Sequence, residues 1–255
     1  MVRYEVIRER ATLTIDDPER RNPMSVETME ELAHGARRAM ADEGVRVLVI
    51  TGAGERAFSA GGDLSSGFVD DPVGLHRSRG TLADLFRTLR RGGKPTIARI
   101  NGHALAGGFG LAVACDIPVC VDDAKLGAPE INVGLWPMMI SAILASAMPQ
   151  KAALELMMTG RIISAQEARD LGAISRVVTR TNLDDAVDEV VDGLVSKSPA
   201  VLAMGKRAFY AVSDPGFDAA LDRLQGGLTA VSLAEDSREG VMAFVEKRQP
   251  RWSGR

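Results

Sequence analysis

The chain has few residues of the kinds that form covalent crosslinks or bind metals. Among its 255 residues are two cysteines, Cys115 and Cys120, each inside an apolar run. We expect both to be buried thiols in a reducing compartment, not a disulfide. The three histidines and two cysteines show no spacing typical of metal ligands, so no metal site is predicted.

Aromatic residues, excess basic charge and long apolar runs are also scarce. Aromatics make up 4% of the chain, and 31 Lys and Arg face 34 Asp and Glu for a net charge of −3. These values argue against base-stacking platforms and against a basic nucleic-acid surface. The longest breaker-poor apolar run, Leu105 to Cys115, is shorter than the about 20 residues that cross a bilayer. The N-terminus alternates like a strand and lacks an apolar signal core, so we expect a cytoplasmic protein without nucleic-acid or membrane partners.

The most informative stretch runs from Thr96 to Asp116. Its first five residues, to Ile100, predict a short buried strand after Lys94-Pro95. Asn101-Gly102 then turns the chain, and Gly107 and Gly108 open an apolar helix. The first turn of a helix has backbone N–H groups without internal acceptors, and its dipole adds partial positive charge. This junction predicts a place to stabilise an anion, although the same glycines would also permit close helix packing.

The first glycine loop in chain order, Ala57 to Leu64, also follows a predicted buried strand, Val45 to Thr51, and the loop at Gly107 is the second. Two such loops suit a ligand oxygen held between two backbone donors, which is an oxyanion hole. Glu130 follows a proline between apolar segments, where partial desolvation would raise its pKa toward that of a useful base. The alternative for Glu130 is a helix-start or surface ion-pair residue.

The order of the predicted elements indicates an α/β protein with strands covered on both faces. The first half alternates strands and helices, and the last third is mainly helical. No low-complexity linker or fixed-period repeat interrupts the chain. We therefore divide it into a core of residues 1–195 and a helical C-terminal region of residues 196–255.

Several segments, in order, resemble the crotonase superfamily, the enoyl-CoA hydratase/isomerase group. They are FSAGGDL, NGHALAGGFGLAVACD, APEINVGLWP, ELMMTGRIISAQEARDLGAISRVV and AFVEKRQP. The resemblance spans about Tyr4 to Pro250. It implies a crotonase-like spiral of repeated ββα units with a helical C-terminal trimerisation region. It also implies a homotrimer or homohexamer, and an acyl-CoA substrate of which coenzyme A is a part, with no separate cofactor.

The resemblance also assigns residues to the site. The two amides that would hold a thioester enolate belong to Ala60 and Gly107, and Glu130 matches a family glutamate. The residues that would contact CoA are Asn22, Pro23, Met24, Ala60, Gly61, Gly62, Asp63, Leu64, Phe244 and Lys247. For Lys247, a solvated surface cation is the alternative. Independently, the apolar cluster from Leu135 to Met139, which includes Trp136, is predicted to wall the acyl pocket, although core packing would also suit it.

Departures from the family pattern bear on the reaction. Gly110 stands where hydratases of the family carry a first glutamate, Ala106 replaces a glycine, and Met138 to Ser141 replace a glycine-rich continuation. Hydration by two carboxylates would lack one of them, whereas double-bond isomerisation needs a single base. The prediction is thus isomerisation by Glu130. A hydratase using another carboxylate, from Asp70, Asp71 or Asp84, and a non-catalytic acyl-CoA binder remain alternatives.

A serine hydrolase, an enzyme of another class, is disfavoured. AFSAG, Ala57 to Gly61, approaches the nucleophile elbow of serine hydrolases, with Ser59 as nucleophile. Ala57 replaces the first glycine of that motif, and the last histidine of the chain is His103, too early for a hydrolase triad.

Overall fold

The computed structural model describes residues 1–62, 72–133, 135–212, 235–236, 239, 242–243 and 246–255. A six-stranded sheet forms its centre, in the order β1-β2-β4-β7-β9-β12. β1 pairs with β2 in antiparallel fashion, and the other neighbours are parallel. The strands are β1 (Val2–Ile7), β2 (Arg10–Ile15), β4 (Val47–Gly52), β7 (Thr96–Ile100), β9 (Ile117–Val121) and β12 (Arg176–Val178).

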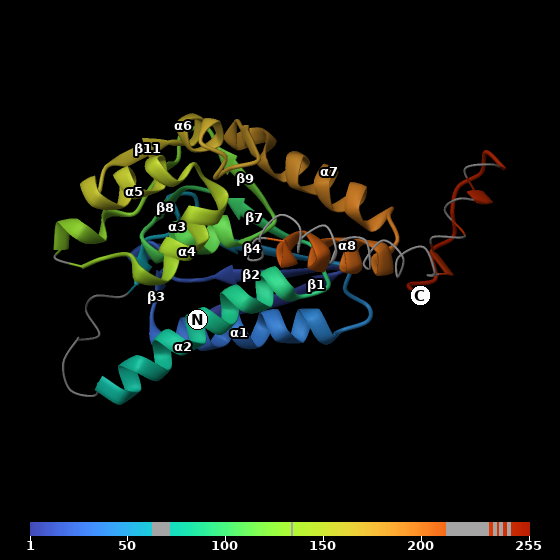
Figure 1. Ribbon diagram of the computed structural model, residues 1–255, viewed down its shortest axis with the longest axis horizontal. Coiled ribbons are helices and arrows are strands. Elements are labelled where there is room, and N and C mark those ends of the chain that lie inside the picture. The colour runs from blue at the N-terminus through green and yellow to red at the C-terminus, as the bar shows by residue number, and fades with distance from the viewer. Residues whose placement is uncertain (63–71, 134, 213–234, 237–238, 240–241, 244–245) are drawn as a thin grey trace.

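Helices cover both faces of this sheet. On β2, Leu13 is buried against Gly35 of α1 (Val26–Ala41), where a methyl group on the glycine would lie 2.4 Å from the leucine. Arg10 points to the other face and pairs with Asp188 of α7 (Leu183–Val195) at 2.5 Å. Because side chains alternate along a strand, α1 and α7 lie on opposite faces of the sheet, as Figure 1 shows. The prediction of covered strands is confirmed.

A second, smaller sheet has the order β11-β10-β8-β5. β5, β8 and β10 run parallel, and β11 is antiparallel to β10. Its strands are β5 (Ala57–Ser59), β8 (His103–Leu105), β10 (Lys125–Gly127) and β11 (Ile162–Ser164). The two-residue strands β3 (Pro23–Met24) and β6 (Gly61–Gly62) form a third, parallel pair. Strands of two or three residues show no periodicity, so the sequence pattern did not reveal these sheets.

The chain repeats one path through the two larger sheets. β4, β7 and β9 enter the large sheet, and each is followed by a strand of the small sheet, β5, β8 or β10, and then by a helix. The helices are α2 (Pro72–Arg91), α3 (Gly107–Ala114) and α4 (Met138–Ala147), after which α5 (Gln150–Thr159) follows. This is a spiral of ββα units, so the predicted crotonase-like fold is confirmed. α3 is buried along its length in the middle of the molecule (Figure 1).

The C-terminal region begins with α8 (Pro199–Ala211), which follows α6 (Ala165–Asp170), β12 and α7. Lys206 and Tyr210 of α8 bind the carboxylate of Asp116, at 2.6 Å and 2.9 Å, and so attach α8 to the spiral. The end of the chain also returns to α8. The carboxylate of Asp236 accepts hydrogen bonds from Ser198, the N-cap of α8, and from Ser253 and Gly254. The division at residue 195 stays a prediction.

Candidate active site

Three segments predicted to form the site leave the same edge of the small sheet. β5 leads into Ala60 to Gly62, β8 into Ala106 and Gly107, and β10 into Pro129 and Glu130. Because the three strands are parallel neighbours, their carboxyl ends meet at one edge. The amide of Ala106 donates to the carbonyl of Gly127 at 2.8 Å, which fixes the second and third segments side by side.

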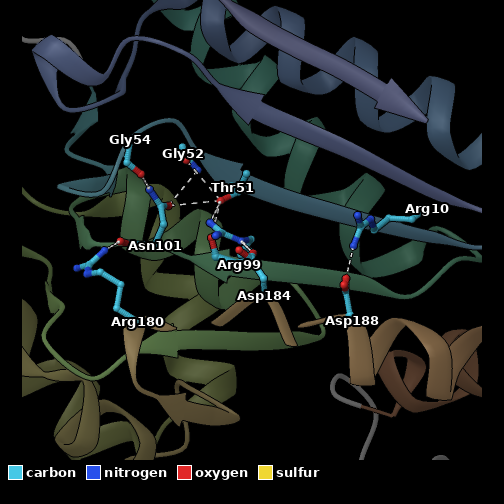
Figure 2. Close-up of polar contacts among 9 residues, drawn as sticks. All are labelled: Arg10, Thr51, Gly52, Gly54, Arg99, Asn101, Arg180, Asp184 and Asp188. Carbon is cyan, nitrogen blue, oxygen red and sulfur yellow. Dashed lines mark hydrogen bonds and ion pairs between the residues drawn. The ribbon is translucent and has the colours of Figure 1, made fainter. Parts of the chain in front are cut away.

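Two asparagines hold the turn that precedes β5. Asn101 donates to the carbonyl of Gly54 at 2.7 Å and accepts from the amide of Gly52 at 3.2 Å (Figure 2). Asn22 donates to the carbonyls of Ala53 and Ala57, at 2.9 Å and 2.7 Å, and its oxygen accepts from the amide of Asp17. The side chain of Asn22 is fully buried and its hydrogen bonds are made within the protein. It therefore positions the loop, and the backbone amide of Asn22 is engaged as well, since it donates to the carbonyl of Asp17 at 2.8 Å.

The second glycine loop opens α3 as predicted. Gly107 is the first residue of the helix, and its N-cap Ala106 has φ 52° and ψ −129°. A non-glycine residue in that conformation stores strain, which explains why a glycine would suit position 106 better. A side chain at Gly107 would meet Cε of Met24 at 2.7 Å and would lie 3.9 Å from the amide nitrogen of Gly62. The start of α3 is thus adjacent to the first glycine loop.

The structure corrects the predicted donor in the first loop. The amide of Ala60 donates to the carbonyl of Arg21 at 2.9 Å, so it is occupied within the protein. Gly61 donates to Oγ of the buried Ser59 at 3.1 Å. β6 pairs in parallel with β3, where Pro23 has no N–H, so the ladder uses the amide of Met24. In this alternation the ladder does not use the amide of Gly62, whose nitrogen lies 3.9 Å from where a Cβ on Gly107 would be.

Glu130 lies in the short 3-10 helix η3 (Pro129–Val133) at this edge. Its Oε2 atom is buried and has no hydrogen-bond partner among the described residues. Burial raises the pKa of the carboxyl above its ordinary value, and a hydrogen bond from its own backbone amide opposes this shift. Burying a carboxylate oxygen without a hydrogen-bond partner costs free energy of folding. Such a group is typical of a site that exchanges a proton with a substrate.

The space beside Gly110 is filled. A methyl group on Gly110 would lie 2.0 Å from Cγ2 and 2.6 Å from Cβ of Ile140 in α4. Ile140 is 2% exposed, so it is packed in the core at this point. An isoleucine side chain therefore takes the space into which a side chain at position 110 would extend.

Comparison with known proteins agrees with this arrangement. A sequence model described as enoyl-CoA hydratase/isomerase matches residues 9–255. The chain belongs to the enoyl-CoA hydratase/isomerase family. It is therefore an enzyme of the crotonase superfamily, as the resemblance implied.

The relatives and solved structures are similar along nearly their whole length. A protein of Thermus thermophilus is 36% identical over 254 residues, covering 95% of this chain and 96% of that protein, and its name places it provisionally among the enoyl-CoA hydratases. The carnitinyl-CoA dehydratase of Proteus mirabilis is 35% identical over 248 residues, covering 95% of this chain and 94% of that protein. The crystal structure of an enoyl-CoA hydratase from Mycobacterium smegmatis superposes with a TM-score of 0.93 at 32% identity and covers 98% of both chains.

The structure describes some of the remaining predicted residues of this family enzyme, and others lie outside the described ranges. Met24 is buried beside Gly107, and Trp136 is partly buried against the core. Lys247 is exposed in the C-terminal segment and has a positive φ of 54°. Asp63, Leu64 and Phe244 lie outside the described residues, as do Asp70 and Asp71. Asp84 is exposed and pairs with Arg87 at 2.6 Å.

Other classes of site find no support in the described part of this family enzyme. No group of three or more His, Cys, Asp or Glu side chains there could hold a metal ion. Cys115 and Cys120 are buried free thiols, and burial raises the pKa of Cys120 to about 12. None of the described helices combines the length and apolar character needed to cross a bilayer.

Sequence reasoning did not foresee two features of this region. Gly62 was expected only to contact CoA, and Ile140 was noted only within Met138 to Ser141, without its contact with Gly110. Pro23 was a usable signal for Gly62. Proline has no N–H to donate, so the hydrogen bond from β3 to β6 comes from the amide of Met24. For Ile140 no local signal exists.

Proposed function

We propose that this enzyme moves the double bond of an enoyl-CoA thioester, from the 3-enoyl to the 2-enoyl position, with Glu130 as the sole proton carrier. One observation carries the proposal. The buried, unpartnered carboxylate oxygen of Glu130 lies at the glycine edge, while Ile140 takes the place of a second carboxylate at Gly110. The proposal leaves one acid/base group for the reaction, which is what isomerisation requires.

In the proposed reaction the thioester oxygen accepts hydrogen bonds from the amides of Gly62 and Gly107. Glu130 removes a proton from C2, and the electron pair moves toward the thioester carbonyl to give a dienolate. The same carboxyl then returns the proton to C4, so the double bond shifts from C3–C4 to C2–C3. The raised pKa of Glu130 helps the first step, because it makes the carboxylate a stronger base toward the C2 proton. Each oxyanion donor is worth about 2.7 to 4 kcal/mol in comparable sites.

The CoA portion of the substrate would lie along β3 and β6, against the backbone of Asn22 to Met24 and of Ala60 to Gly62. The buried side chain of Asn22 supports a structural role there, so we expect backbone groups to make the contacts. The acyl group would be apolar and lie against Trp136 and Met139, which are partly buried on the core. Titration calorimetry with crotonyl-CoA tests binding, and no heat at millimolar ligand would count against this placement.

The deciding experiment measures both reactions on the same protein. Isomerisation of a 3-enoyl-CoA should be faster than hydration of the matching 2-enoyl-CoA, and Glu130→Gln should lower isomerisation by about 10²- to 10⁴-fold. The rate should rise with pH through the raised pKa of Glu130 and then level off, because the base must be ionised. Asp84→Asn is the matched control, since that carboxylate is exposed and paired with Arg87. Equal rates of the two reactions, or activity unaffected by Glu130→Gln, would contradict the proposal.

A hydro-lyase is the competing function, favoured by the names of the relatives, which include a hydratase and a dehydratase. It would require a second acid/base group from elsewhere, because the glycine at position 110 supplies none. Hydration in the wild type that is lost in Asp84→Asn would support this alternative over isomerisation.

A further inference from the structure

Building on the proposed function, we propose that Ile140 is a specificity-determining residue, which keeps a second acid/base group and its water out of the site. Ile140 does this by filling, from α4, the space that a side chain on the first turn of α3 would need. The reaction is thereby limited to proton transfer within the substrate.

The position of the contact relative to the proposed donors supports this role. Gly107 and Gly110 are three residues apart on α3, and residues at that spacing lie on the same face of a helix. At Gly107 that face meets Met24 and approaches the Gly62 amide. One turn further on, at Gly110, the same face meets Ile140. Ile140 therefore covers the part of α3 next to the proposed oxyanion donors.

The contact between Gly110 and Ile140 leaves no room for a side chain at position 110. An added Cβ on Gly110 would approach Cγ2 of Ile140 to 2.0 Å, and both residues are buried. A β-branched side chain in a helix has one strongly preferred rotamer, so Ile140 cannot easily turn away. A glutamate at position 110 would need the isoleucine to be displaced.

The hydroxyl next to Ile140 in the sequence is already engaged within the protein. Ser141 is the adjacent polar residue, and its Oγ donates to the carbonyl of Pro137 at 2.7 Å, one turn back along α4. It also contacts Sδ of Met157 at 3.3 Å. Its hydroxyl is thus directed into α4 and α5, away from the face on which Ile140 meets Gly110.

The first test is a stability cycle that does not depend on activity. Gly110→Ala should lower Tm by roughly 2 to 10 °C through overpacking against Ile140. In the Ile140→Ala background the same change should cost less, because the clash is gone. Ile143→Ala, which shortens another buried residue of α4, is the matched control and should not relieve Gly110→Ala. Equal costs of Gly110→Ala in all three backgrounds would overturn the steric claim.

The second test asks for a change of reaction. Gly110→Glu alone should be destabilised and should not hydrate. Gly110→Glu with Ile140→Ala should fold and raise the ratio of hydration to isomerisation by about 10²-fold or more, since it supplies the second carboxylate and its space. Rapid hydration by Gly110→Glu alone, or a folded double variant that isomerises without hydrating, would overturn the proposal. A wild type that does not isomerise would instead refute the proposed function and leave the stability cycle to decide the role of Ile140.

Discussion

At the scale of single residues, Glu130 is an acid that the fold makes expensive to ionise. One of its oxygens is buried without a partner, and desolvation is the first cause of its raised pKa. A raised pKa means that the folded state favours the neutral form more than the unfolded state does. The residue that we propose as the base therefore costs stability at neutral pH, as expected of a functional group.

Glu130→Gln should consequently be more stable than the wild type at pH 7. The wild type loses stability as pH rises through the folded pKa of Glu130, so the advantage of the variant should shrink as pH is lowered toward the ordinary glutamate value. Thermal unfolding of both proteins between pH 4 and pH 8 measures this difference. Glu155→Gln is a useful contrast, because Glu155 is exposed, pairs with Arg161 and has its pKa lowered by that hydrogen bond. A Glu130→Gln protein less stable than the wild type at pH 7 would show that the carboxylate is better solvated than we infer.

At the scale of elements, the site depends on how the turn before β5 is held. Asn22 and Asn101 approach the carbonyl of Ala57 together, at 2.7 Å and 3.3 Å. Asn22 precedes β3 and Asn101 follows β7, so two turns of the spiral are joined at the turn between β4 and β5. Figure 2 shows the Asn101 side of this junction, with the asparagine among Thr51, Gly52 and Gly54.

Asn22→Ala and Asn101→Ala should each lower the free energy of unfolding by about 1 to 3 kcal/mol, because each leaves buried backbone groups unpaired. The two effects should not add, since both side chains bind the Ala57 carbonyl. Urea unfolding of the two single variants and the double variant measures the coupling. Strict additivity would show that the asparagines act on the turn independently.

The attachment of α8 gives a second prediction at this scale. Asp116 accepts from the amide and hydroxyl of Thr96 and from Lys206 and Tyr210. Asp116→Ala would leave the largely buried ammonium of Lys206 without its carboxylate and should cost about 3 to 5 kcal/mol. Lys206→Met should cost less, because Asp116 keeps its other three donors. Chemical denaturation compares the two variants, and a greater loss in Lys206→Met would contradict this ranking.

At the scale of the whole molecule, the described surface keeps large apolar side chains near the C-terminal region. Phe209 of α8 is 70% exposed and Met242 is 50% exposed. We propose that an assembly covers these exposed apolar side chains, since the family resemblance implies a trimer built through the C-terminal region. α8 lies at the opposite end of the molecule from α5 (Figure 1).

We therefore expect light scattering at micromolar concentration to give the mass of three or six chains. Phe209→Glu should shift the mass toward the monomer, since a charge would be placed in the contact. Met158→Glu, at a residue of α5 that is 60% exposed, is the matched control and should leave the mass of the trimer unchanged. A monomer mass for the wild type would refute the prediction of an oligomer.

The sequence by itself determined the elements that depend on local pattern. The long strands of the large sheet and the helices α1, α5 and α7 follow from apolar periodicity and caps. Ser25 at α1 and Ser164 at α6 are such caps, and each accepts a hydrogen bond from the backbone amide three residues further on. The two glycine loops and Glu130 could likewise be found, because glycine and a proline-flanked carboxylate are local signals. These features require no knowledge of which distant residues meet.

The tertiary structure alone decided which backbone amides and side chains of the site are engaged within the protein, and which space is filled. Ala60 and Gly62 are two residues apart, yet the carbonyl of Arg21 occupies the amide of the first, and the ladder between β6 and β3 does not use the amide of the second. The side chain of Asn22 proved to be committed to the turn before β5. Ile140 is 30 residues from Gly110 in sequence, and it meets that glycine because α4 packs on α3. Hydrogen-bond occupancy and side-chain volume depend on such distant contacts, which no local pattern records.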